Sequence, residues 1–373
     1  MKPKISTPGF FLRRYPSSPA HVIRRHYVST SSPFKQRRPW LRVAVVTIAA
    51  TGLGAYVRSR QENQSTTLNP LSFTPYSLIS KEPVSSSGSI FTLKAPRPDS
   101  DNERVYEETW ETGIWSVMFK QPQLQIGRDY TPLPPLLTED GDEATLRFYI
   151  RRDPFGEMSR YLHGLEMGAT VEMRGPQIEC EIPEDTQRIL FIAGGTGIAP
   201  ALQAGHTLLR RTNEVHKPTI HILWANRRRD DCAGGHNNST MTSTSQRSWF
   251  SRFVGSSTTS PAVVENDSSS PSSPSLVVKE LEALRSQYPE QVTVDYFVDE
   301  ENTFIGKKEI LNFAKCTSLQ QTPKRNMILV SGPEGFISYM AGPKVWAQGM
   351  ELQGSLQGII KELNLHEWMI WKL

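Results

Sequence analysis

Residues 189–200 read ILFIAGGTGIAP, and this stretch decides the fold of the second half of the chain. Its first five residues, Ile189 to Ala193, form a continuous apolar run, as expected of a parallel strand buried on both faces. The glycines that follow lie where this strand meets a helix predicted over Ala201 to Arg211. Glycines there let backbone N–H groups approach a pyrophosphate, whose charge a helix N-terminus favours. The loop does not match the common GxGxxG fingerprint, so a plain tight turn is the alternative.

Further strands are predicted on the C-terminal side of this loop, at Ile220–Ala225, Val292–Phe297 and Met327–Val330. Strands that alternate with helices predict a doubly wound parallel sheet, here a nucleotide-binding domain over residues 185–373. Residues 233–275 interrupt it and are dominated by Ser, Thr, Gly, Pro and Asn. That composition cannot bury enough apolar surface, so we expect a disordered surface loop there.

The preceding part of the chain favours shorter, alternating strands. Apolar and polar residues alternate over Ser89–Lys94 and Thr170–Arg174, and more loosely over Leu146–Arg151, with turn-rich stretches between them. Several short strands with one helical insertion predict a small antiparallel β-barrel over residues 73–184. The predicted fold class is therefore an all-β barrel followed by an α/β domain.

Four motifs in order give the sequence a family resemblance that runs from about Phe73 to the C-terminus, apart from the insertion. They are Arg128-Asp129-Tyr130-Thr131, Gly156 to Leu162 with a later Gly175-Pro176, Gly194 to Pro200, and Ser331-Gly332-Pro333. The sequence resembles the ferredoxin-reductase superfamily and, within it, the NADH–cytochrome-b5 reductase branch. This resemblance implies an FAD-binding barrel and an NAD(P)-binding sheet, with FAD and either NADH or NADPH as cofactors.

The resemblance also implies which residues bind the two cofactors. Residues expected at FAD are Arg128, Tyr130, Thr131, Gly156, Glu157, Met158 and Ser159. Residues expected at the nicotinamide nucleotide are Gly194, Gly195, Thr196, Gly197, Ser331, Gly332 and Pro333. An arginine provides a cationic fork for a pyrophosphate, and Ser159 is expected to cap a helix that faces the phosphates. Thr196 and Ser331 are expected near the reacting rings. Without the motif around them, Arg128 would be interpreted as a solvated surface charge and Tyr130 as an ordinary aromatic residue of the barrel.

Hydride transfer needs no strong general base, because the cofactors carry the chemistry and the protein aligns them. No histidine or carboxylate is therefore predicted as catalytic. Cys180, Cys232 and Cys316 are widely spaced and form no CxxC or Cys/His cluster, so neither structural zinc nor a disulfide framework is indicated. No metal site is expected.

Three features depart from the family pattern or leave it undecided. Ser331 stands where the family has a cysteine, which removes a polarizable thiol near the nicotinamide. Trp371 either covers the flavin or packs in the core. Arg227, Arg228 and Arg229 follow a strand and either hold a 2′-phosphate, which would admit NADPH, or are surface charges.

The N-terminal segment differs sharply in charge from the rest. Residues 1–60 contain 12 Lys or Arg and no Asp or Glu, which leaves 30 bases against 38 acids in the remainder. A basic arm on an acidic body suits a nucleic-acid arm, a membrane-surface segment or a targeting peptide. Because this arm is also rich in Ser, we predict a mitochondrial presequence over residues 1–39 and no nucleic-acid partner. A disordered basic tail is the alternative.

A short apolar run, Val43 to Val57, follows the arm. Fifteen helical residues reach only about 22 Å, but Trp40, Tyr56, Arg42 and Arg58 suit the two interfaces of a bilayer. We predict one transmembrane helix over residues 40–58 and a linker over 59–72, with a secretory apolar segment as the alternative. Ten bases precede Val43, so the positive-inside rule places the body in the intermembrane space.

Together, these features resemble fungal mitochondrial flavoproteins that assist haem attachment to cytochrome c. That resemblance implies an inner-membrane protein that passes electrons from NAD(P)H through FAD to haem or a haem protein, with cytochrome c haem lyase as a partner. Two other interpretations stay open. The chain can be a mitochondrial NADH–cytochrome-b5 reductase, or an FAD-binding assembly factor whose catalysis has decayed.

Overall fold

The computed structural model describes residues 47, 50–54, 66–96, 100–136, 145–213, 216–237, 273–315 and 325–373. Residues 63–373 form one compact unit. The predicted presequence and Cys316 lie outside the described residues, as do most of the predicted anchor and residues 59–65 of the linker. Within the anchor, Thr47 and residues 50–54 are helical. Among the residues described, no helix is long and apolar enough to span a bilayer.

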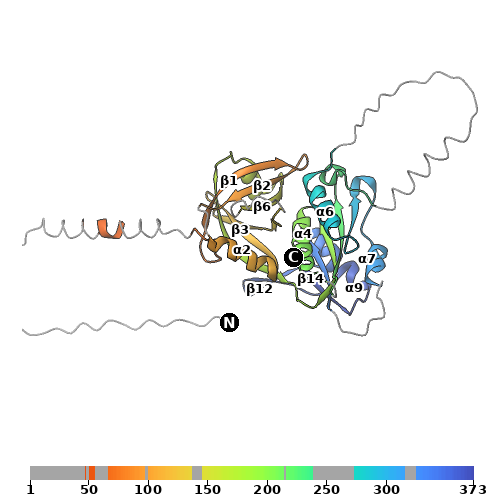
Figure 1. The fold of residues 1–373 in the computed structure, drawn as a ribbon. Coiled ribbons are helices and arrows are strands. Elements are labelled where there is room, and N and C mark those ends of the chain that lie inside the picture. The colour runs from red at the N-terminus through yellow and green to blue at the C-terminus, as the bar shows by residue number, and fades with distance from the viewer. Residues whose placement is uncertain are drawn as a thin grey trace, which may run out of the picture. The chain divides into compact units, whose positions relative to one another are not determined.

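The first lobe is the predicted antiparallel barrel, built from seven strands (Figure 1). In spatial order they are β4 (Ile126–Tyr130), β3 (Gly113–Gln121), β7 (Thr170–Glu181), β1 (Thr74–Pro83), β2 (Gly88–Lys94), β6 (Thr145–Arg151) and β5 (Pro132–Leu133). Every pairing between them is antiparallel. The outermost strands, β4 and β5, are separated in the chain by Thr131 alone, so the sheet closes at that residue.

Large aromatic side chains fill the barrel. Trp115, Phe119, Phe148 and Tyr76 are each fully buried, and the rings of Phe119 and Phe148 lie 4.8 Å apart in an edge-to-face arrangement. The hydroxyl of Tyr76 shares a 2.6 Å hydrogen bond with that of Tyr106, which satisfies two buried polar groups together. Such packing keeps the strands that carry the site in fixed positions.

The barrel carries two helices, α2 (Ser100–Thr112) and α3 (Glu157–His163), where the sequence predicted one. Helix α2 escaped prediction because its apolar face is narrow. Its buried positions are Asn102, Tyr106, Thr109 and Trp110, which have helical spacing but include two polar residues. Asn102 is buried because its side chain accepts a hydrogen bond from the Leu68 N–H and donates one to the Thr66 carbonyl.

The second lobe is the predicted parallel sheet. Its strand order is β10 (Val292–Val298), β9 (Thr219–Asn226), β8 (Thr186–Gly194), β11 (Arg325–Ser331) and β14 (Trp368–Lys372), all parallel. Alternate residues of β8 enter two separate cores. Ile189 and Phe191 pack with α4 (Ile198–Leu209) and α6 (Leu276–Gln287), whereas Leu190 and Ile192 pack with α7 (Lys307–Ala314) and α8 (Glu334–Ala341). Helices therefore cover both faces, as a doubly wound sheet requires.

Helix α4 begins three residues earlier than predicted, at Ile198. Pro200 lies in its first turn, where no intrahelical hydrogen bond requires its missing N–H. Short 3-10 turns follow three strands: η1 (Gly195–Gly197) after β8, η2 (Arg229–Cys232) after β9, and η3 (Asp299–Glu301) after β10. These turns all lie at the carboxyl edge of the sheet.

The ends of the predicted insertion 233–275 meet each other. The Ser275 N–H donates to the Ala233 carbonyl at 2.9 Å, and Pro274 packs against Gly234. Residues 238–272 lie outside the described part of the chain. The predicted domain that surrounds the insertion is thus continuous in space across it.

A hairpin that the sequence did not predict, β12 (Val345–Ala347) and β13 (Met350–Leu352), lies between α8 and α9 (Gly358–Glu362). Lys372 anchors its base, because the buried ammonium donates to the carbonyls of Pro343 at 3.0 Å and Ser355 at 3.4 Å. Burial lowers the pKa of this lysine, and the charge of Lys344 acts in the same direction.

The described cysteines, Cys180 and Cys232, are buried free thiols. Burial raises the pKa of Cys180 to about 12 and that of Cys232 to about 11. Both therefore stay protonated at neutral pH, which leaves them without the thiolate that nucleophilic chemistry needs.

His206 makes the stability of the fold sensitive to acid. It lies on α4 against the edge of Trp110, with ring centroids 5.5 Å apart. Burial, and then the charge of Arg210, lower its pKa from 6.5 to about 4. Below pH 6.5 the unfolded chain therefore binds a proton that the folded protein does not, and stability falls until the pH reaches about 4.

We expect acidification from pH 7 to 5 to remove about 2 kcal/mol of unfolding free energy through His206. His206→Phe should lose this part of the pH dependence while keeping the ring contact with Trp110. Urea unfolding of both proteins at pH 7 and 5 measures the difference. Equal pH slopes in the two proteins would show that His206 is not the responsible group.

Candidate functional site

One cavity of about 470 Å³ collects most of the predicted site residues. The predicted residues that line it lie in four segments. Arg128 to Thr131 run from β4 to the start of β5, where the barrel closes, and we call this segment the barrel seam. The others are Gly156 to Ser159 at the start of α3, Thr196 and Gly197 before α4, and Ser331 with Gly332 after β11. Two segments come from each lobe. Motifs up to about 200 residues apart in sequence therefore border a single space. Gly194, Gly195 and Pro333, also predicted at the site, do not line it.

The barrel seam contributes one cation and one aromatic ring. Arg128 is exposed and has one described hydrogen bond, from Nη1 to the Gly127 carbonyl at 3.0 Å, so most of its donors remain available. Tyr130 packs against Phe119, with ring centroids 4.9 Å apart. Burial raises the pKa of Tyr130 to about 12, so its hydroxyl stays a neutral donor near pH 7.

The prediction for Ser159 is wrong in its structural part. Gly156 is the N-cap of α3, and Ser159 lies inside the first turn. Its Oγ accepts a hydrogen bond from the Asp153 N–H at 3.0 Å and donates to the Gly156 carbonyl at 3.2 Å. The serine therefore folds the preceding loop onto the helix. A Cβ on Gly156 would lie 2.7 Å from the Ser159 Oγ, so this fold leaves no space for a side chain there.

The glycine loop after β8 packs directly against the turn after β11. A Cβ on Gly197 would lie 2.4 Å from the Ser331 carbonyl oxygen, and one on Gly332 would lie 3.0 Å from the Gly194 Cα. Gly195 has a φ of +55°, and its carbonyl accepts a hydrogen bond from the Trp224 indole at 2.9 Å. Gly194 and Gly195 thus contribute to the conformation of the loop without lining the cavity, whereas Thr196 and Gly197 line it.

Several residues that line the cavity were not predicted from the sequence, among them Tyr149, Arg151 and Phe155. Arg151 ends β6, and its guanidinium lies 3.4 Å from the position that a Cβ on Gly195 would occupy. It therefore brings a barrel cation up to the glycine loop of the other lobe. Phe155 is 92% exposed although it borders the cavity. Its place just before Gly156 was the signal that could have suggested it.

The three arginines after β9 are not equivalent. Arg229 donates to both carboxylate oxygens of Glu301 and to the Gly235 carbonyl, and its hydrogen bond to Glu301 is the main cause of its raised pKa. Arg228 donates to the Ser86 hydroxyl at 3.2 Å. Arg227 is exposed. The guanidinium of Arg227 is therefore more available to a 2′-phosphate than that of Arg229.

Trp371 packs in the core. Its indole donates to the Glu179 carbonyl at 2.9 Å, its ring packs against the buried cluster around β8, and it does not line the cavity. No histidine lines the cavity in the described part of the chain. His163 instead bonds the Ile150 carbonyl and His221 bonds Asp295.

These residues fit two dinucleotides. The cavity lies at the carboxyl edge of a doubly wound sheet, where such folds bind ligands, and its size is within the range of cofactor sites. Arg128 and Arg151 lie on it for phosphate charge, and Tyr130, Tyr149 and Phe155 offer rings for stacking. The glycine loop lacks side chains where a pyrophosphate would approach.

Comparison with known proteins agrees with this division. The profile of the oxidoreductase FAD-binding domain matches residues 75–182, and that of the oxidoreductase NAD-binding domain matches residues 191–255. A Kluyveromyces lactis protein named NADH-cytochrome b5 reductase 2 is 26% identical over 300 residues, which cover 79% of this chain and 82% of that protein.

Two other fungal relatives match over a smaller share. The Saccharomyces cerevisiae protein named cytochrome c mitochondrial import factor CYC2 is 30% identical over 184 residues, 46% of this chain and 50% of that protein. A Schizosaccharomyces pombe protein named uncharacterized FAD-binding protein C17H9.12c is 31% identical over 170 residues, 43% of this chain and 58% of its own length. The chain spans little more than half the length of these two relatives.

The fold, the cavity and the domain matches define a two-domain oxidoreductase that uses FAD and a nicotinamide dinucleotide. Both domains are of the ferredoxin-reductase type. More closely, the chain is an NAD(P)H-dependent FAD reductase, and its relatives include proteins named NADH-cytochrome b5 reductase.

The contact between Gly197 and Ser331 allows a matched test. In Gly197→Ala the new methyl group would meet a backbone oxygen, so the two turns must separate. We expect a loss of about 1–3 kcal/mol in stability and slower nucleotide-dependent flavin reduction. Thermal unfolding and anaerobic flavin absorbance measure the two effects.

Gly335→Ala is the control, because no atom lies within 4 Å of the position of its new Cβ. It lies in α8, where alanine is favoured over glycine by about 0.5–1 kcal/mol. Equal stability losses in the two variants would contradict the packing described for the glycine loop.

Proposed function

We propose that this reductase passes electrons from NAD(P)H through FAD to a haem-type acceptor and supports haem attachment to cytochrome c in mitochondria. The observation that carries the redox part is the convergence of the Arg128–Thr131 seam and of Thr196 and Gly197 from the glycine loop on one cavity. When bound there, FAD would supply hydride acceptance from the nicotinamide and release of single electrons, which would suit a haem iron.

The chain's own residues are proposed to hold and align the two cofactors. Arg128 and the first turn of α3 bind the FAD phosphates, while Tyr130 and Thr131 hold the flavin side of the cofactor. The glycine loop and the Ser331–Pro333 turn bind the nicotinamide nucleotide. Arg151, which the structure adds to this set, supplies positive charge between them. The close-packed lobes exclude water from the place where the rings meet.

The proposed location rests on the N-terminal composition and on one relative's printed name. Residues 1–60 contain 12 bases and no acids, and the S. cerevisiae relative is named a mitochondrial import factor. We propose residues 1–39 as presequence, 40–58 as an inner-membrane anchor and 59–72 as linker. The FAD domain (73–184) and the NAD(P) domain (185–373) then face the intermembrane space.

A haem acceptor is preferred because the name of the S. cerevisiae relative refers to cytochrome c. Haem for cytochrome c must be delivered before attachment, so cytochrome c haem lyase is the proposed partner. The second candidate acceptor is cytochrome b5. It is favoured by the K. lactis relative, which matches over a larger share of both chains and is named for that acceptor.

An anaerobic reduction assay tests the proposal in two steps. The purified protein should be yellow, and NADH or NADPH should bleach its flavin absorbance. Haemin and cytochrome b5 are then compared as acceptors at equal concentration. Faster reoxidation by haemin supports the haem role, whereas faster reoxidation by cytochrome b5 supports the second candidate. A yellow protein that neither nucleotide bleaches would contradict both.

Arg128→Ala tests the proposed FAD phosphate site. Loss of the guanidinium removes charge-assisted hydrogen bonds, each contributing roughly 1.5–3 kcal/mol, so we expect FAD affinity to fall by at least about tenfold. Fluorescence of released FAD after gel filtration measures retention. Arg325→Ala is the control, because Arg325 pairs with Asp185 on the surface and does not line the cavity. Full flavin occupancy in Arg128→Ala would refute the assignment.

A further inference from the structure

Gln203 connects the two lobes beside the cavity. It lies on α4, about one and a half turns after the glycine loop, and is fully buried. Its Nε2 donates to the Pro132 carbonyl at 2.8 Å, and its Oε1 accepts from the Trp115 N–H at 2.9 Å. A single side chain of the nucleotide-binding lobe therefore satisfies one acceptor and one donor of the barrel backbone.

Both partners lie at special points of the barrel. Pro132 begins β5 directly after Thr131, the residue at which the barrel closes and which lines the cavity. Trp115 lies where the pairing of β3 with β7 shifts register, between Ile114 and Trp115. Gln203 thus binds the backbone at the end of the barrel sheet, where β5 pairs with β6 alone, and at an irregularity in the pairing of β3 with β7.

The chemistry of these partners fixes the orientation of the amide. A backbone N–H can meet only the amide oxygen, and a backbone carbonyl can meet only the amide nitrogen. A flip of the side chain would therefore break both hydrogen bonds and leave two buried groups unpaired. An apolar residue of the same size would do likewise, so the position requires a group that donates and accepts at once.

We propose that Gln203 is a positioning residue that fixes the Thr131 seam relative to the glycine loop, and so sets how the flavin and the nicotinamide are aligned. This inference rests on the proposed assignment of the cavity to the two cofactors. Helix α4 starts at the glycine loop, and Gln203 makes the first of the described side-chain hydrogen bonds from this helix to the barrel. Hydride transfer depends steeply on alignment, since a displacement of about 1 Å can cost about 100-fold in rate.

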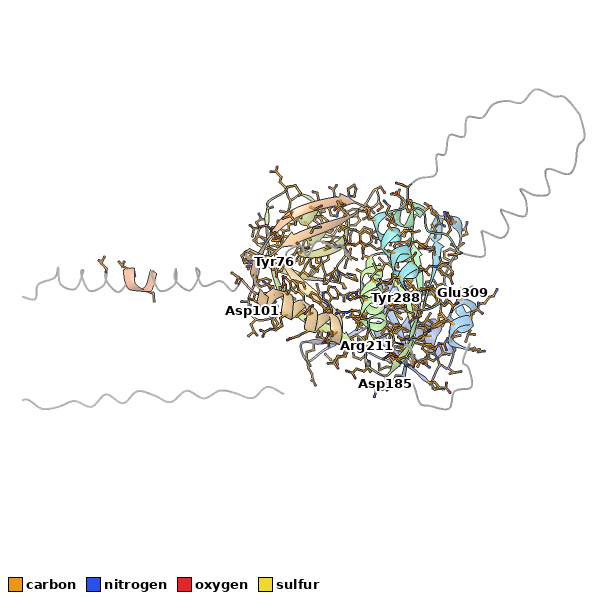
Figure 2. The ribbon with its side chains drawn as sticks, viewed as in Figure 1. Tyr76, Asp101, Asp185, Arg211, Tyr288 and Glu309 are labelled. Carbon is orange, nitrogen blue, oxygen red and sulfur yellow. The ribbon has the colours of Figure 1, made fainter. Side chains whose placement is uncertain are left out.

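Two more residues farther along the chain also bind the barrel, Thr207 on α4 and Arg211 two residues after its end. Thr207 donates to the Trp110 carbonyl at 2.8 Å. Arg211 donates to the carbonyls of Ile182, Pro183 and Glu111, at the lobe boundary (Figure 2). Gln203 and Thr207 are four residues apart and so share one side of the helix. Thr207→Val is a matched control, because it removes a buried contact between the lobes without touching the seam.

The test uses the full-length protein in detergent with Gln203→Leu, Thr207→Val and the parent. Anaerobic stopped-flow absorbance gives the limiting rate of flavin reduction and the nucleotide concentration at half the maximal rate. We expect Gln203→Leu to lower the limiting rate by about 10- to 100-fold with little change in the half-saturating concentration. Thr207→Val should lie within about twofold of the parent in both, although both variants unfold at lower temperature.

Visible circular dichroism of the bound flavin gives a readout that does not depend on turnover. The signal reports the asymmetric surroundings of the ring, so Gln203→Leu should change it and Thr207→Val should not. If neither nucleotide bleaches the parent, the proposed function fails. The dichroism would still decide whether Gln203 orients the flavin site.

Gln203→Glu covers the case in which Gln203→Leu does not fold. A protonated carboxyl can accept from Trp115 and donate to Pro132, whereas the carboxylate cannot donate. Burial raises the pKa of such a group, so the limiting rate relative to the parent should be near one at pH 6 and fall as the pH rises to 9.5. A flat ratio over this range, or equal rate losses in Gln203→Leu and Thr207→Val, would overturn the proposal.

Discussion

The attachment of helix α4 to the barrel is the constraint on which the rest of the site depends. The N-terminus of α4 follows the glycine loop, while its barrel-facing side is held by hydrogen bonds from Gln203 and Thr207, and Arg211 adds another just after its C-terminus. A helix is stiff along its axis, so fixing one side of it also fixes the loop at its start. The distance between the two halves of the cavity is therefore set by one element and does not depend on a flexible joint.

A second connection between the lobes limits rotation about α4. Arg147 on β6 makes hydrogen bonds of 2.7 and 3.2 Å to the two carboxylate oxygens of Glu280 on α6, with both side chains largely buried. The turn between β1 and β2 adds Ser85 bound to Asp231 and Ser86 bound to Asp230. Polar contacts at several separated points resist both sliding and rotation, which apolar packing alone would resist less because it has no direction.

Much of this arrangement could be predicted from residues whose pattern is local. The apolar run Ile189–Ala193 predicts a strand buried on both faces, and the structure shows its alternate side chains entering two cores. The loop at Gly194–Gly197 predicts the carboxyl edge where the cavity lies. Such features depend on the order of neighbouring residues, so one sequence is enough to find them.

The features that escaped prediction depend on contacts between distant residues. The sequence predicts Ser159 as a helix cap, but the residue lies within the first turn, where its hydroxyl accepts a hydrogen bond from the Asp153 N–H. Helix α2 has a buried face that includes Asn102, whose partners Thr66 and Leu68 lie more than 30 residues away. In the sequence, Arg151 cannot be distinguished from other charged residues at strand ends, and only the fold shows that it lies beside Gly195. In each case, the fold decides whether a polar residue is solvated, structural or part of the site.

The serine at position 331 can be weighed in the same physical terms. Its carbonyl oxygen, not its side chain, is the atom against which Gly197 packs, and its strand position opposite Ala193 in β8 is set by backbone pairing. Exchange of a thiol for a hydroxyl leaves both constraints unchanged. The turn therefore keeps its shape with serine, and the side chain can alter only the local polarity at the cavity wall. Because the shape of this turn is a property of the backbone, the serine gives no geometric reason to expect that hydride transfer has been lost.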